Sequence, residues 1–158
     1  MSATKTTTWK IEPHTKAKHE ILRRYLGAWF GILGTKTPRI VYIDGFCGPV
    51  IYQGGEPGSP IIALSQAKPL AESNPGTEYV FVFIDESNDR VENLMGLINQ
   101  QSFPKNMQIF SLAGKFEDKI SELLSYVEAE GVSLAPTFAF IDPFGFSGVP
   151  FKRNEMSG

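Results

Sequence analysis

Residues 39–60, RIVYIDGFCGPVIYQGGEPGSP, carry the pattern from which the rest of the chain can be interpreted. The continuous apolar run at 40–43 predicts a strand buried on both faces. Asp44 ends this strand, and a glycine-rich loop follows, in which Ser59 is a candidate helix N-cap and Pro60 suits the first helical position. A strand, an acidic residue, a glycine-rich turn and a helix, in this order, are typical of an open α/β sheet that binds a ligand at the carboxyl ends of its strands.

The loop matches neither of two common phosphate-binding patterns. No Gly-Lys-Ser/Thr follows it, so it is not a Walker A loop, and its spacing is Gly45-x-x-Gly48 followed by Pro49 instead of G-x-G-x-x-G. An Asp-Gly-x-x-Gly turn is equally compatible with a tight connection from strand to helix. Its meaning therefore depends on the sequence downstream.

Downstream of the loop, strand patterns alternate with helical ones. Apolar residues recur at three- and four-residue steps within the helical segments, whereas the strands are short continuous apolar runs. The last helix is expected to face inward through Phe116, Ile120, Leu123, Leu124 and Val127. His14 and His19, five residues apart in the first helix, are expected at the surface. We expect helices at 9–33, 60–71 (interrupted at Pro69), 88–101 and 115–130, and strands at 40–43, 78–86, 107–112 and 136–143.

After the first helix, strand and helix alternate with short connections. Such an order predicts a mostly parallel sheet with right-handed crossovers. The fold class is therefore α/β, a Rossmann-like, mostly parallel sheet with helices on both faces. We expect a single domain at 9–150, a disordered Thr/Ser/Lys-rich tail at 1–8 and a second tail at 151–158.

Length and composition exclude several classes of protein. The chain has 158 residues, enough for one domain with a hydrophobic core. Its apolar runs are far shorter than the roughly 20 residues that span a bilayer, and its start has no apolar segment typical of a secretory signal. Cys47 is the single cysteine, which precludes an internal disulfide and favours a cytoplasmic location.

The charge is distributed unevenly along the chain. Residues 1–39 contain eight basic and two acidic residues, whereas the remainder contains seven basic and fifteen acidic ones, so the two parts carry +6 and −8. A basic amino-terminal helix that precedes an acidic domain can contact the phosphates of a nucleic acid. An ordinary solvated helix face remains the alternative.

Three of the expected strands end in carboxylates. These are Asp44, Asp85 with Glu86, and Asp142. Because the carboxyl ends of parallel strands meet at one edge of a sheet, we expect these groups to converge where such folds bind ligands. A carboxylate after the second strand, opposite a glycine-rich turn after the first, suits a nucleoside, since it can accept hydrogen bonds from both ribose hydroxyls.

Asp142, Pro143 and Phe144 form the other candidate site. Proline fixes the backbone after the acid, and the aromatic ring offers a face on which a planar group can stack. A nucleobase flipped out of its stack would use such a combination of acceptor and aromatic plate. The alternative is an ordinary turn with Phe144 in the core.

Together these segments resemble a known family. DGFCG at 44–48, FIDES at 83–87 and DPFG at 142–145 are similar to motifs I, II and IV of class I S-adenosylmethionine-dependent methyltransferases. With HTKAKHEILRRYLGAW at 14–29, they more closely resemble the three-Cys-motif partner family, bacterial methyltransferase-like proteins encoded beside a radical-enzyme-like protein with three cysteines. The resemblance covers about residues 9–150.

The resemblance implies a role for each matching residue. Asp44, Gly45 and Gly48 would line the methionine side of S-adenosylmethionine, and Asp85 or Glu86 would hold the ribose. Asp142, Pro143 and Phe144 would face the methyl acceptor, a nucleic acid or a partner protein, and the three-cysteine protein is the implied partner. Gly114 to Glu117 occupy the position where such enzymes often touch the adenine.

The chain departs from the family pattern in two ways. Pro49-Val50 stands where motif I usually has a third glycine, and Phe144-Gly145 replaces Pro-Tyr in motif IV, which disfavours base methylation. Methyltransferase sheets have seven strands, so the resemblance implies a chain truncated after the fourth. A strand order of 3-2-1-4 would then leave the fourth strand as an exposed edge.

Two other functions remain open at this point. Asp44, Asp85 and Asp142 could instead ligate Mg²⁺ in a phosphoryl or phosphodiester enzyme, although the leading interpretation involves no metal. Alternatively, the fold could be a non-catalytic scaffold that binds a partner protein through the basic helix and the exposed fourth strand.

Overall fold

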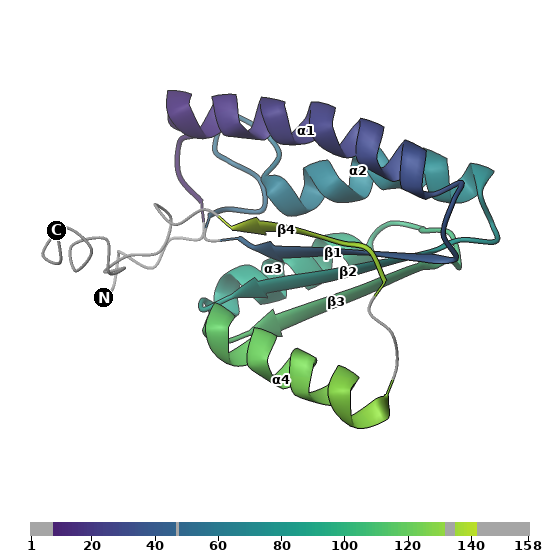
Figure 1. Ribbon diagram of the computed structural model, residues 1–158. Coiled ribbons are helices and arrows are strands. Elements are labelled where there is room, and N and C mark those ends of the chain that lie inside the picture. Colours follow the sequence, from purple (N-terminus) through teal and green to yellow (C-terminus); the bar gives the residue numbers. More distant parts are fainter. Residues whose placement is uncertain (1–7, 47, 132–134, 142–158) are drawn as a thin grey trace, which may run out of the picture.

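The computed structural model describes residues 8–46, 48–131 and 135–141. Helices and strands alternate along the chain as the sequence predicts (Figure 1). The elements are α1 (Pro13–Leu33), β1 (Arg39–Gly45), α2 (Ser59–Ser73), β2 (Glu78–Asp85), α3 (Asn88–Asn99), β3 (Met107–Ala113), α4 (Phe116–Glu130) and β4 (Thr137–Ile141).

The four strands form one parallel sheet in the order β3-β2-β1-β4. This confirms the predicted α/β class, and the strand order is the 3-2-1-4 arrangement considered with the resemblance to methyltransferases. β1 and β2 are central and almost fully buried, in agreement with their continuous apolar runs. At the carboxyl edge, Gly45 of β1 lies beside Ile84 of β2 and Ile141 of β4.

Helices cover the two faces of the sheet unequally. One face packs against α1, α2 and α3, and its core is rich in aromatic rings such as Phe30, Tyr42 and Phe81. The other face has a smaller core around Ile43, Val82 and Ile84, which α4 covers (Figure 1). The sheet is therefore the middle of three layers.

In α1 the apolar residues at three- and four-residue steps were expected to form one core-facing stripe, but Ile21 and Tyr25 of that stripe are exposed. The helix also begins at Pro13 and not at Trp9. Leu22, Leu26 and Phe30 are buried. The expectation that both histidines lie at the surface is wrong for His19, which is buried and has its ring 6.1 Å from that of Tyr52. The physical reason is that position 19 lies on the same helix face as Leu22 and Leu26.

The helix after the glycine-rich loop differs from expectation at both ends. Gly58 is the N-cap of α2 and Ser59 is its first helical residue. Pro69 does not interrupt the helix, which continues to Ser73. Residue 65, whose carbonyl loses its helical donor to the proline, is exposed, so water can satisfy that carbonyl.

The helix on the second face packs less deeply than expected. Phe116, Ile120 and Leu123 contact the sheet, but Leu124 was expected inward and is half-exposed. Among the described residues of α4, none is buried. Within the described residues, the apolar contact of α4 with the sheet is limited to one small cluster.

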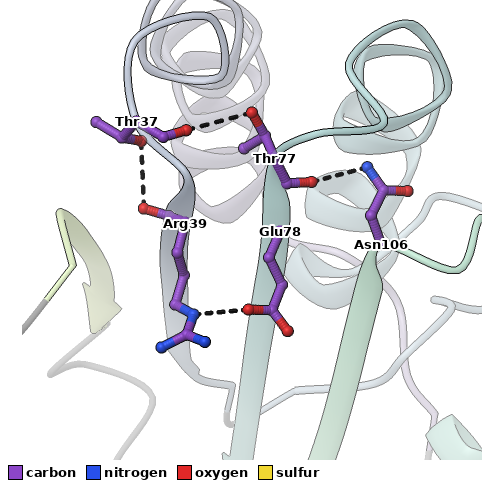
Figure 2. A network of polar contacts seen from close by, with 5 residues as sticks. All are labelled: Thr37, Arg39, Thr77, Glu78 and Asn106. Carbon is purple, nitrogen blue, oxygen red and sulfur yellow. Dashed lines mark hydrogen bonds and ion pairs between the residues drawn. The ribbon is translucent and has the colours of Figure 1, made fainter. Parts of the chain in front are cut away.

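Polar contacts tie the starts of three strands together at the amino edge (Figure 2). The Thr77 hydroxyl donates to the Thr37 carbonyl, at 3.2 Å, and the Arg39 guanidinium pairs with Glu78 at 2.7 Å. The Asn106 side-chain amide donates to the Thr77 carbonyl at 2.8 Å and also to carbonyls at the end of α2. An open hollow on this edge, of about 460 Å³, is lined by residues such as Pro75 and Lys105. It lies opposite the edge on which the predicted site residues are found.

Of the helices that the structure describes, none is both long enough and apolar enough to cross a membrane.

Candidate functional site

The acidic ends of β1 and β2 lie at the same edge of the sheet. Both strands run parallel with a continuous register, in which Asp44 is beside Phe83 and Asp85 follows Ile84. β1 also marks the point where the chain changes direction across the sheet, because its neighbours are β2 and β4. In open α/β sheets, such a switch point is where ligands bind.

Asp44 is fully buried within β1, one residue before the strand ends. The Tyr42 hydroxyl donates to its Oδ2 at 2.9 Å. No described residue donates to the other oxygen, Oδ1. Burial raises the pKa of this carboxyl to about 7, against the effect of the Ser59 and Tyr42 hydroxyls, which lower it. Near neutral pH, Asp44 can therefore hold or release a proton, and its Oδ1 can accept a hydrogen bond.

Asp85 has both oxygens engaged within the chain. Arg90 binds them bidentately, with Nε at 2.8 Å from Oδ2 and Nη2 at 2.9 Å from Oδ1. The backbone N–H of Ser87 donates to Oδ1 at 2.8 Å. Such a buried, paired carboxylate fixes the first turn of α3 to the end of β2. Sequence reasoning missed Arg90, whose only signal was a basic residue in the first turn of the expected helix.

The neighbouring carboxylate, Glu86, has the opposite environment. It lies between the end of β2 and the Ser87 N-cap of α3, and it is exposed. Of the two carboxylates at the end of β2, Glu86 is the one exposed to solvent, whereas Asp85 is buried. Of the two residues that the sequence offered for a ribose, the structure thus leaves Glu86 accessible.

Gly45, the last residue of β1, and Gly48 and Gly58 of the following segment are needed for close packing within the chain. A Cβ at Gly45 would lie 2.7 Å from the Phe116 ring, and one at Gly48 would lie 2.8 Å from the Tyr52 hydroxyl. At Gly58, a Cβ would clash with the carbonyl of Pro49. The ring of Phe116 therefore packs directly against the backbone of Gly45 at the end of β1.

Trp9 also lies at this edge, which the sequence did not suggest. The Arg90 guanidinium is 5.7 Å from the centre of the Trp9 ring, a cation–π arrangement. The Trp9 carbonyl accepts a hydrogen bond from the N–H of Gln53 in the glycine-rich loop, at 3.1 Å. The segment before α1 thus crosses the loop and joins it to the Asp85–Arg90 pair.

After β3, the backbone turns sharply beside the same edge. Gly114 has φ +152°, a conformation that favours glycine, and its N–H donates to the Asp85 carbonyl at 2.9 Å. Lys115 is the N-cap residue of α4, and Phe116 is its first helical residue. The segment that the resemblance assigned to the adenine therefore adjoins the end of β2.

Several predicted residues lie outside the described part of the chain. Asp142, Pro143 and Phe144 do so, as does Cys47. Ile141, which precedes Asp142, is beside Gly45. The acceptor role of the three residues stays a prediction.

No group of three or more His, Cys, Asp and Glu within residues 8–46, 48–131 and 135–141 could hold a metal ion. The Mg²⁺ alternative also requires Asp142, and Arg90 already neutralises one of its ligands, Asp85.

On α1, Arg23 and Arg24 both pair with Glu20, at 2.7 and 3.1 Å, which reduces the charge available to a nucleic acid.

The chain was also compared with known proteins. No protein-family model matches it, and the curated proteins contain no significant match.

Proposed function

We propose that the chain is an S-adenosylmethionine-binding, methyltransferase-like protein. The observation that carries the proposal is Asp44, a fully buried carboxylate at the switch point of a parallel sheet with an oxygen, Oδ1, to which no described residue donates. Leaving such an acceptor unsatisfied costs free energy, which a ligand with an ammonium or hydroxyl group would recover. The resemblance of motifs I, II and IV supports the same ligand.

Different residues at this edge bind different parts of the ligand. Asp44, Gly45 and Gly48 bind its methionine end, and Glu86 accepts hydrogen bonds from the ribose hydroxyls. Asp85 acts indirectly, because its pairing with Arg90 holds the segment that carries Glu86. The bound sulfonium supplies an activated methyl group, so the protein has to align an acceptor with it.

Within this proposal, Asp142, Pro143 and Phe144 orient the acceptor. The acceptor is a nucleic acid or a protein. The resemblance to the three-Cys-motif partner family adds a three-cysteine, radical-enzyme-like protein as the binding partner.

Calorimetry with S-adenosylhomocysteine tests the proposal. We expect the wild-type chain to bind, and Glu86→Ala to bind about 10- to 100-fold more weakly, because a charged hydrogen bond contributes about 1.5–3 kcal/mol. Glu92→Ala, which removes an exposed carboxylate from α3, serves as the matched control and should bind as the wild type does. Gly48→Val should abolish binding, since a side chain there displaces Tyr52.

Asp85→Ala is also expected to abolish binding, but through the fold. Removing one partner of a buried ion pair typically costs about 3–5 kcal/mol, so thermal unfolding should separate this variant from Glu86→Ala. The proposal fails if the wild-type chain does not bind, or if Glu86→Ala and Gly48→Val both retain wild-type affinity.

A further inference from the structure

Helix α1 has a second apolar stripe in addition to the one that faces the core. Ile21, Tyr25 and Ile32 are 67%, 56% and 57% exposed, and Ala28 lies between them in the same row. The core-facing residues Leu22, Leu26 and Phe30 lie on the neighbouring face of the helix. Four apolar positions in a row are unusual for a helix face that water covers, because such faces normally carry polar residues.

The stripe lies beside β4, which is an edge strand of the sheet among the described residues. The Tyr25 ring is 5.3 Å from that of Phe138 on β4, whereas Gly27, on another side of the helix, approaches Gln66 of α2. The stripe therefore points away from α2 and past β4. Among the described strands, β4 pairs with β1 alone, and Ile141 at its end is 44% exposed. A backbone edge and an apolar helix stripe thus adjoin on one side of the molecule.

The spacing of the stripe is the same in both directions. The steps from Ile21 to Tyr25, from Tyr25 to Ala28 and from Ala28 to Ile32 are four, three and four residues. In an antiparallel pair of identical helices, Ile21 would face Ile32 of the second copy and Tyr25 would face Ala28 of the second copy. A two-fold interface requires such a self-complementary pattern.

The charges of α1 favour the same antiparallel arrangement. Its basic residues, Lys16, Lys18, Arg23 and Arg24, all lie before residue 25, and residues 25–33 carry no charge. Parallel copies would place the two 16–24 segments, each with four basic residues and Glu20, side by side, whereas antiparallel copies in this register place residues 20–24 of each against the uncharged residues 29–33 of the other. Like charges across an interface are unfavourable, so the pattern selects against the parallel arrangement.

We propose that two copies of this chain associate about a two-fold axis perpendicular to the sheet, with β4 pairing antiparallel to β4 and α1 packing against α1. An axis in that direction keeps both α1 helices on the same face of the joined sheet, so strand pairing and helix packing can form together. The backbone groups at the edge of β4 then find partners, and both apolar stripes are buried.

The oligomeric state of the full chain tests this proposal. Sedimentation equilibrium should show a dimer with a dissociation constant below about 0.1 mM. Ile32→Glu should weaken the dimer at least about tenfold, because it places a charge in the apolar contact. Leu124→Glu on α4, where the native side chain is 50% exposed, is the matched control and should leave the dimer intact.

A double variant tests the register. Ile21→Lys combined with Ile32→Glu places opposite charges across the two-fold axis and should restore dimerisation, whereas glutamate at both positions should not. In the wild-type chain, the amides of β4 should also exchange more slowly with solvent as protein concentration rises.

Three results would overturn the proposal. They are a chain that stays monomeric at about 0.1 mM, a dimer that Leu124→Glu weakens as much as Ile32→Glu does, and no recovery with the opposite charges. None of these measurements involves S-adenosylmethionine, so they are independent of the proposed function.

Discussion

The buried carboxyl of Asp44, the residue on which the proposed function depends, also makes the stability of the fold depend on pH. Tyr42 satisfies one of its oxygens, and burial opposes ionisation of the carboxyl. The folded protein therefore holds a proton on Asp44 over a range of pH in which the unfolded chain has lost it. This difference makes the contribution of Asp44 to stability depend on pH.

The first prediction concerns that dependence. The pKa of Asp44 rises from 3.8 in the unfolded chain to about 7 in the folded one, so the folded state binds more protons between these values. Its contribution to the free energy of unfolding is fully present below the lower pKa and falls as pH rises through the higher one, by at most on the order of 4 kcal/mol. Asp44→Asn should lack this loss.

Denaturant unfolding at about pH 5 and about pH 8 measures the effect as the difference between the wild type and Asp44→Asn. Glu86→Gln, which changes an exposed carboxylate at the same edge, is the control and should follow the wild type. If Asp44→Asn loses as much stability as the wild type between the two pH values, Asp44 does not titrate as described.

At the scale of elements, the end of α1 is set by its fit against β2. Gly34 is the C-cap residue, and its N–H donates to the Phe30 carbonyl at 2.8 Å. A Cβ at Gly34 would clash with the Tyr79 hydroxyl and lie 2.6 Å from the Phe30 carbonyl. The absence of a side chain, and not an unusual backbone angle, is what this position requires, since its φ is −62°.

The second prediction compares two glycines of this region. Gly34→Ala should destabilise the fold by about 1–3 kcal/mol, the usual cost of overpacking. Gly31→Ala, where a Cβ would meet nothing within 4 Å, should instead stabilise it by about 0.5–1 kcal/mol, because alanine favours a helix interior. Chemical denaturation of both variants measures the change in the free energy of unfolding. Equal changes would show that the close contact of residue 34 with Tyr79 does not determine the stability at this position.

At the scale of the whole molecule, the two faces of the sheet differ in how well helices cover them. α2 and α4 each have 15 residues, but seven residues of α2 are buried and none of the described residues of α4 is. Among the described residues, the second face is covered by one helix, α4, over a small cluster around Ile43. Stability is therefore expected to vary across the fold.

The third prediction is that the backbone amides of α4 exchange with solvent faster than those of α2. Hydrogen exchange followed by mass spectrometry compares the two helices in one experiment, and their equal length removes one source of difference. Opening α4 exposes less apolar surface than opening α2, so its free energy of opening is lower. Equal protection would mean that the small second core is as stable as the large one.

Local patterns determined the class of the fold and the order of its elements, whereas the strand order 3-2-1-4 was considered only within the resemblance to methyltransferases. Continuous apolar runs and three- to four-residue periodicity are properties of neighbouring residues, so they can be read without a structure. The burial of His19, the exposure of Leu124 and the pairing of Asp85 with Arg90 depended on which helix face meets which part of the sheet. Only tertiary packing decides that, because the partners are chosen by three-dimensional proximity and not by spacing along the chain. For the same reason, the sequence placed Asp85 and Glu86 at the right edge but could not tell the paired carboxylate from the accessible one.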